Sequence, residues 1–130
     1  MKKFLILIIL NTVETFSKPL GMENGSIPPE AITASSELDD KHNALRARLN
    51  TKPEDELMGA WVPSQSDENQ WLQVNLGKVT RLVKIATQGE AGESASRHVK
   101  QFGLSYSLQG EEFIPYVEDA TEKVWHNSCL

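Results

Sequence analysis

The alternation of apolar and polar residues is most regular in the second half of the chain, where it predicts β-strands. In residues 70–76 (QWLQVNL), an apolar side chain at every second position gives the period of a strand with one buried face. A Gly-Lys pair at 77–78 predicts a tight turn. Residues 79–88, which are rich in β-branched side chains, predict a second strand.

A hairpin is predicted further along the chain. Residues 99–107 alternate again, with Phe, Leu and Tyr side chains on one face and Gln, Gly and Ser on the other. The Gln-Gly pair at 109–110 predicts a turn after which residues 112–117 pair back onto the preceding strand. Several short strands without a long helical pattern predict an all-β sandwich or barrel.

The first half of the chain is less regular. Residues 19–29 contain several Gly and Pro and predict turns and extended chain. ITASS at 32–36 predicts a short strand, whereas ALRARL at 44–49 fits both a strand and a helical turn. Aromatic residues at strand-like positions are expected in the core. They are Trp61, Trp71, Phe102, Tyr106 and Phe113.

The N-terminal segment 1–17 has the features of a signal peptide. Two lysines precede an unbroken apolar run, FLILIIL, and small residues follow up to a cleavage site expected after Ser17. The run is shorter than the about 20 residues that span a bilayer. The alternative interpretation is a buried first strand. A cleaved leader predicts a secreted, extracellular protein in which residues 18–130 form one domain.

The composition narrows the class of partner. The 130 residues suffice for one domain, and 39% of them are hydrophobic, which allows a real core. The net charge of -5 argues against nucleic acid as a partner, because binding phosphates needs an excess of basic residues. Cys129 is the single cysteine and therefore cannot form an internal disulfide. Its role is left open.

A series of short motifs follows in order along the chain. The motifs are PLGMENGSI (19–27), ITASS (32–36), ARLN (47–50), Trp61 with Pro63, QWLQVNLG (70–77), ATQG (86–89) and LSYSLQGEEF (104–113). Together they resemble the discoidin domain, also called the coagulation factor V/VIII (F5/8) type C domain. The resemblance implies a galactose-binding-like jelly-roll β-sandwich. It also implies an extracellular module, as in cell adhesion, that binds carbohydrates, phospholipids, collagen or other proteins through loops at one end.

The chain departs from the family pattern at both ends. Phe16 stands where the family usually has a cysteine, and Cys129 comes too early to be the partner of that cysteine. The family domain continues with further closing strands, so the resemblance implies a domain that is truncated at its C-terminus. Asn75 replaces a usual Asp in the strand before Gly77, which is expected to weaken a local hydrogen bond. Arg48, within the ARLN motif, is expected to be structural and to pair with an internal carboxylate.

The resemblance places three loops at the binding end: residues 37–43, 51–59 and 90–97. Carboxylate, amide and basic side chains in these loops suit the hydroxyl groups of a sugar. Exposed large apolar side chains would instead suit a lipid surface. The candidate ligand-binding residues are Leu38, Asp39, Asp40, His42, Asn43, Arg46, Leu57, Met58, Glu90 and Arg97.

Three hypotheses of function follow. The first is a module that recognises glycans or matrix and cell-surface proteins. The second is a peripheral phospholipid-binding module, which the carboxylates beside Leu38, Leu57 and Met58 disfavour on an anionic bilayer. The third is a truncated domain without an independent function.

Catalytic and metal signatures are weak or absent in the sequence. There is no Gly-x-Ser-x-Gly elbow, phosphate loop or His-Glu-x-x-His motif, so we expect no enzyme and no cofactor. Asp39, Asp40 and Asn43 lack the spacing of a calcium loop, and the histidines lack zinc spacing, so no metal site is expected. Asn24-Gly25-Ser26 is a glycosylation sequon.

Overall fold

A computed structural model describes the chain at residues 3–9, 18–90 and 97–127. Its elements are β1 (Lys3–Ile9), η1 (Pro29–Ala31), β2 (Ile32–Ala34), η2 (Asp40–His42), η3 (Ala44–Ala47), β3 (Trp71–Val74), β4 (Gln101–Ser107), β5 (Ile114–Pro115), β6 (Val117–Glu118), β7 (Thr121–Glu122) and β8 (Val124–His126). Strands dominate, and the helical elements are single 3-10 turns. The predicted all-β class is confirmed. None of the helices in the described ranges is long and apolar enough to cross a membrane.

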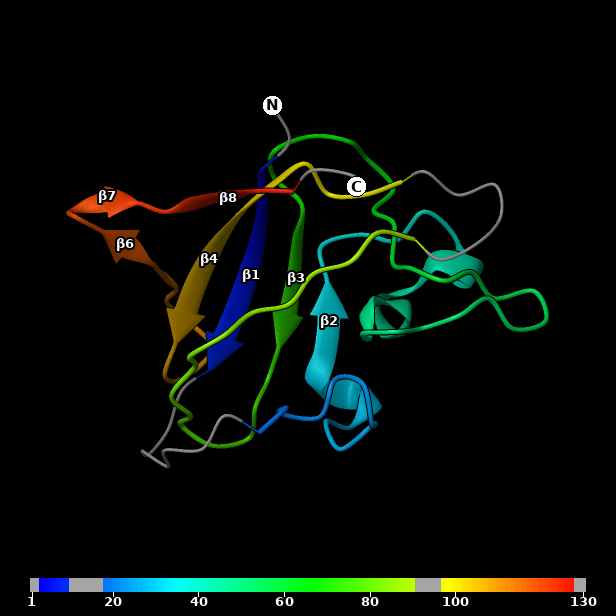
Figure 1. Ribbon diagram of the computed structural model, residues 1–130, viewed down its shortest axis with the longest axis horizontal. Helices are drawn as coiled ribbons and strands as arrows, with labels where there is room; N and C mark the ends of the chain where they lie inside the picture. The colour runs from blue at the N-terminus through cyan, green and yellow to red at the C-terminus, as the bar shows by residue number, and fades with distance from the viewer. Residues whose placement is uncertain (1–2, 10–17, 91–96, 128–130) are drawn as a thin grey trace.

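The strands form one main sheet and a small ribbon (Figure 1). The order in the main sheet is β2-β3-β1-β4-β5, and β8 also pairs with β4. β1 runs parallel to both of its neighbours, whereas the other pairs in the sheet are antiparallel. β6 and β7 pair as a separate two-stranded ribbon.

β1 is formed by most of the apolar run of the predicted signal peptide. Its central Ile6 is opposite Leu72 of β3 on one side and Leu104 of β4 on the other. In the structure this segment is therefore a first strand, which is the alternative to a signal peptide that the sequence left open. Cleavage of residues 1–17 stays a prediction, and residues 10–17 lie outside the described ranges.

Four of the five predicted strands are confirmed, and one is not. Segments 32–36, 70–76 and 99–107 contain β2, β3 and β4, and β5 pairs back onto β4 as the hairpin prediction required. The strand predicted at 79–88 is wrong, because that segment crosses the main sheet as irregular chain. β3 already pairs with β2 and β1, so neither of its edges is free for the segment that follows it.

The ambiguous segment 44–49 contains the helical turn. Asn43 caps this turn, since its Oδ1 accepts a hydrogen bond from the backbone N–H of Leu45 at 3.1 Å. The turn is a short 3-10 element over Ala44–Ala47. Its Ala44 packs into the core with Ile27, Ile32 and Val74.

β4 is buried on both faces rather than on one. Phe102 and Leu104 are buried as the alternation predicts, but Ser105 and Ser107 on the other face are also buried. Small side chains such as these serines suit that face, because other segments of the same chain pack against it. The Oγ of Ser107 accepts hydrogen bonds from the N–H groups that begin the next turn.

β8 is an element that the sequence reading missed. Trp125 of this strand stacks on Phe102 of β4, with ring centroids 5.4 Å apart and an interplanar angle of 9°. β8 also pairs with β4 through its backbone.

Candidate binding end

The first and second predicted loops contact each other directly. The backbone N–H of Met58 in loop 51–59 donates to the carbonyl of Lys41 in loop 37–43 at 3.0 Å. The ammonium of Lys41 lies 3.3 Å from Oε2 of Glu56. The loops therefore lie at the same end of the sheet, on the right in Figure 1.

The first and third loops meet through buried side chains. Nε2 of His42 lies 3.5 Å from Oε1 of Glu90, and the two side chains are only 6% and 4% exposed. Nδ1 of His42 lies 2.7 Å from Oδ1 of Asp39. On the other side, Nε of Arg97 lies 3.6 Å from Oε2 of Glu90. Four predicted site residues thus form one chain of polar contacts.

The base of the third loop is held by two further hydrogen bonds. The N–H of Glu90 donates to the carbonyl of Arg97 at 2.9 Å. The side chain of Gln88 accepts a hydrogen bond from the N–H of Asn50 at 2.7 Å, which ties this base to the start of loop 51–59. Residues 91–96, between the two ends of the loop, lie outside the described ranges.

The carboxylate of Asp39 makes several hydrogen bonds within the first loop. The hydrogen bond from the His42 side chain lowers the pKa of Asp39, and the N–H groups of Lys41 and His42 act in the same direction. The same N–H bonds make Asp39 the N-cap of η2. Asp39 is therefore held in place by its own loop.

Arg46 and Asn43 also bond within the loops. Nε of Arg46 donates to the carbonyl of Met58 at 2.6 Å, and its Nη2 donates to the carbonyl of Lys52 at 2.5 Å. The amide of Asn43 donates to the carbonyl of Asp40 at 2.7 Å. Arg46 therefore joins η3 to loop 51–59, and Asn43 closes the turn that contains η2. Their role in ligand contact stays a prediction.

Asp40 differs from these neighbours. It is exposed, and no hydrogen bond of its carboxylate is found within the described ranges. Because its carboxylate is not used to hold the loop, it is available to accept hydrogen bonds from a ligand. Among the predicted polar residues of the first loop, Asp40 is the best-placed candidate for direct contact.

Three apolar candidates are exposed at the same end. Leu38 is 44% exposed, and Leu57 and Met58 are each 38% exposed. Leu57 lies beside exposed acidic residues at 54–56, as the sequence indicated. The end therefore presents apolar side chains within an acidic surface.

Arg48 has the structural role that was predicted, but with different partners. Its guanidinium donates to the carbonyls of Met22 at 3.2 Å and Ile27 at 2.7 Å. The predicted internal carboxylate is replaced by backbone oxygens, which a planar fork of donors satisfies equally well. Oδ1 of Asn75 accepts from the N–H of Gly77 at 2.8 Å, and the weakening of this bond relative to an Asp acceptor stays a prediction.

The structure also bears on the residues considered for metal binding and for glycosylation. In the described part of the chain, no group of three or more His, Cys, Asp or Glu residues is placed to hold a metal ion. Asn24 of the sequon is exposed in a turn, where its Oδ1 accepts from the N–H of Ser26 at 3.0 Å. Its glycosylation stays a prediction. Cys129 lies outside the described ranges.

Comparison with known proteins identifies relatives of this chain. The F5/8 type C domain family matches residues 31–128. Coagulation factor V of Homo sapiens is 39% identical over 104 residues, which cover 77% of this chain and 4% of the relative. Pseutarin-C, a venom prothrombin activator non-catalytic subunit of Pseudonaja textilis, is 36% identical over 118 residues, or 87% of this chain and 8% of the relative.

A relative with a different name also matches the chain. Neuropilin-1a of Danio rerio is 32% identical over 114 residues, which cover 86% of this chain and 12% of the relative. In each case the matched region is a small part of a much longer protein. The similarity therefore concerns one domain of these relatives.

Proposed function

The chain belongs to the F5/8 type C (discoidin) domain family, and from this membership we propose that it is an extracellular, non-catalytic binding module for glycans or for matrix and cell-surface proteins. We place recognition at the end formed by loops 37–43, 51–59 and 90–97, and we assign the module to cell adhesion. One relative is itself named a non-catalytic subunit, which supports a binding role rather than an enzymatic one.

The observation that supports this proposal is that the first loop contacts both of the other loops. The Lys41–Glu56 ion pair and the His42–Glu90 pair connect the first loop to the second and third. Loops that are held in advance lose less conformational entropy on binding. The exposed carboxylate of Asp40 then stands on a fixed base, as hydrogen bonding to a hydroxyl-rich ligand requires.

A glycan array, together with a panel of immobilised matrix proteins, tests the proposal. We expect saturable binding that the Asp40→Ala variant weakens by about fivefold or more, since a hydrogen bond contributes about 1 kcal/mol. Glu112→Ala, which removes an exposed carboxylate from the β4–β5 turn, is the matched control and should bind like the unmodified chain. Equal loss in both variants would contradict a site at Asp40.

A phospholipid surface is the second candidate function, and the exposure of Leu57 and Met58 favours it. Flotation with phosphatidylserine vesicles separates the two functions. We expect little flotation, because the acidic residues at 54–56 are repelled by an anionic surface. Flotation that persists in high salt and is lost in Leu57→Ser/Met58→Ser would replace the glycan or protein proposal with the lipid one.

The third hypothesis, a domain without independent function, is tested by folding. A cooperative thermal unfolding transition would exclude it, because an incompletely packed core does not unfold sharply. We expect such a transition, since Ile27, Ile32, Ala44 and Val74 form one buried cluster across the sheet and its flanking turns.

A further inference from the structure

We propose that a cavity on one face of the main sheet binds a single-chain amphiphile with an anionic head group, of the chemical class of the long-chain fatty acids. The cavity has a volume of about 740 Å³, which lies in the range of small-molecule sites. Its lining includes Arg46 and Gly59, which lie at the base of the end loops, but the proposal does not depend on the function proposed for those loops.

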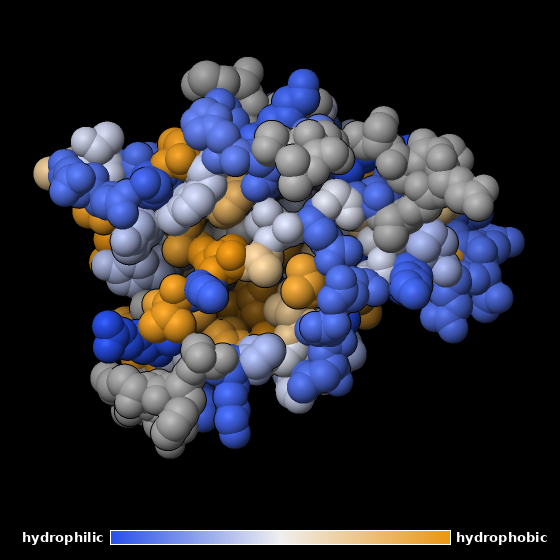
Figure 2. Space-filling model, in the orientation of Figure 1, coloured by the Kyte–Doolittle hydropathy of each residue, from blue (hydrophilic) through white to orange (hydrophobic). Residues whose placement is uncertain are grey.

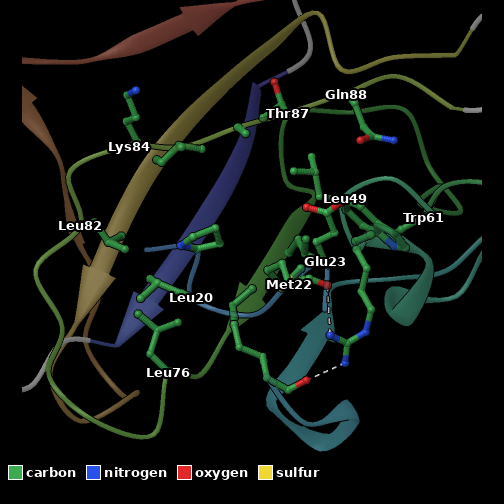
Figure 3. A pocket seen from close by; sticks show the side chains of 18 of the residues that line it. Leu20, Met22, Glu23, Leu49, Trp61, Leu76, Leu82, Lys84, Thr87 and Gln88 are labelled. Carbon is green, nitrogen blue, oxygen red and sulfur yellow. Dashed lines mark hydrogen bonds between the residues drawn. The ribbon is translucent and has the colours of Figure 1, made fainter. Parts of the chain in front are cut away.

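The wall of the cavity is apolar. Leu72 and Val74 of β3 and Phe102 of β4 contribute from the sheet, and the irregular segment 80–89 closes the opposite side. Figure 3 shows Leu20, Leu76 and Leu82 around the hollow, and Figure 2 shows the same region as an apolar depression within a polar surface. Such a lining suits an acyl chain, which is stabilised by the removal of its surface from water.

The charge around the cavity is opposite to that of the chain. The chain carries 18 acidic and 13 basic residues, for a net charge of -5. Yet the described residues that line the cavity include several basic ones and one acidic one, Glu23. The basic ones are Lys18, Arg46, Arg48, Lys78, Arg81 and Lys84. This local excess of basic residues favours an anionic ligand over a cationic one.

Part of this positive charge is free to meet a ligand. Arg46 and Arg48 use their guanidinium groups to hold backbone carbonyls. For Lys78, Arg81 and Lys84, which are all exposed, no ion pair with a carboxylate is found in the described part of the chain. Glu23 bonds to the side chain of Asn50 at 2.6 Å, so its carboxylate already has a partner.

These basic residues and one part of the apolar wall belong to the same segment of the chain. Lys78, Arg81 and Lys84 flank Leu82, which lies beside the hollow in Figure 3. If the head group binds at these cations, the acyl chain of the same molecule would therefore contact Leu82 and the face of the sheet. A wholly apolar ligand would leave the cations unused, and a sugar would leave the apolar wall in contact with polar groups.

The test uses cis-parinaric acid, a fluorescent fatty acid, at concentrations below its micelle threshold. We expect saturable binding at one site per chain that oleate displaces and that dodecyltrimethylammonium, a cationic amphiphile, does not. The methyl ester of cis-parinaric acid should bind at least about tenfold more weakly, because charge-assisted contacts to the head group are lost.

Two double variants locate the site. Lys78→Glu/Lys84→Glu should weaken binding of cis-parinaric acid at least about tenfold. Lys100→Glu/Lys123→Glu makes the same change of charge at positions outside both the cavity lining and the three loops and should bind normally. Thermal melts of both variants establish that each is folded before affinities are compared.

Several results would overturn the proposal. Equal affinity for the acid and its methyl ester would make the cavity a general apolar site. Equal weakening in the two double variants would make the effect one of net charge. Binding seen only with vesicles would assign the basic rim to a bilayer surface, and displacement of the fatty acid by an apolar peptide alone would assign the cavity to a protein segment. The glycan array is read independently, so its failure leaves this result standing.

Discussion

Nε2 of His42 lies 3.5 Å from Oε1 of Glu90, and this contact joins two loops that are far apart in the sequence. Both side chains are almost fully buried, where the effective dielectric constant is low and polar contacts strengthen. Asp39 and Arg97 extend the contact to the surface on either side. The first and third loops are therefore brought together by polar side chains as well as by apolar packing.

Truncation of His42 should destabilise the protein. His42→Ala removes a nearly buried imidazole that lies against Glu90 and is hydrogen-bonded through Nδ1 to Asp39, and loss of a hydrogen bond to a charged group costs about 1.5–3 kcal/mol. Chemical denaturation measures the free energy of unfolding. His126→Ala, which removes an exposed histidine from β8, should change it by less than about 0.5 kcal/mol. Similar effects in the two variants would mean that the buried pair does not stabilise the fold.

The lowered pKa of Asp39 predicts a loss of stability in acid. Because its folded-state pKa lies below the ordinary carboxyl value, ionised Asp39 favours the folded chain at pH values above that ordinary value. This contribution disappears as the pH falls through the lowered pKa, in the range below about pH 4. Asp39→Asn should therefore show a shallower fall of melting temperature in this range.

Asp40→Asn is the control for this experiment, since the Asp40 carboxylate makes no hydrogen bond within the described ranges. Its melting temperature should follow that of the unmodified chain across the same pH range. If Asp39→Asn and the unmodified chain lose stability in parallel, the hydrogen bond between Asp39 and His42 does not contribute to folding.

Gln70 joins two of the family motifs and should be needed for stability. Its buried side chain accepts hydrogen bonds from Ser35 at 2.8 Å and Ser36 at 2.5 Å, and donates to Asp67 at 2.9 Å. Gln70→Ala should lower the free energy of unfolding by about 1–3 kcal/mol. Gln109→Ala, at an exposed turn, is the control.

The same variant should change the titration of Asp67. The hydrogen bond from Gln70 is the largest cause of the lowered pKa of Asp67. In Gln70→Ala that pKa should rise toward its ordinary value, and NMR titration of the side-chain carboxyl carbon measures it directly. An unchanged titration would show that Gln70 does not donate to Asp67 in solution.

Replacement of Arg48 by lysine should not preserve its role. The guanidinium reaches two carbonyls, of Met22 and Ile27, from one planar group, which a single ammonium cannot match in geometry. We expect Arg48→Lys to lose about 1–2 kcal/mol of unfolding free energy. Arg81→Lys, on the exposed irregular segment, should be neutral to folding, so equal losses would contradict a special role for Arg48.

The sequence by itself determined the all-β class, the positions of β2, β3 and β4, and the segments that become loops. These features depend on local causes: a period of two in the apolar pattern and the turn chemistry of Gly and its neighbours. The motifs also identified the family. The candidate ligand-binding residues lie in or beside the segments between strands, because loop positions follow from where the strands end. Their role in binding stays a prediction.

Only the tertiary structure decided how those residues are used. That His42 meets Glu90, and that Arg46 and Asn43 bond to backbone carbonyls, depends on how the loops pack. The sheet order likewise decided that residues 79–88 form no strand, since both edges of β3 were already paired. Local periodicity describes one segment at a time, whereas hydrogen-bond partners and free sheet edges are properties of segments brought together by the fold.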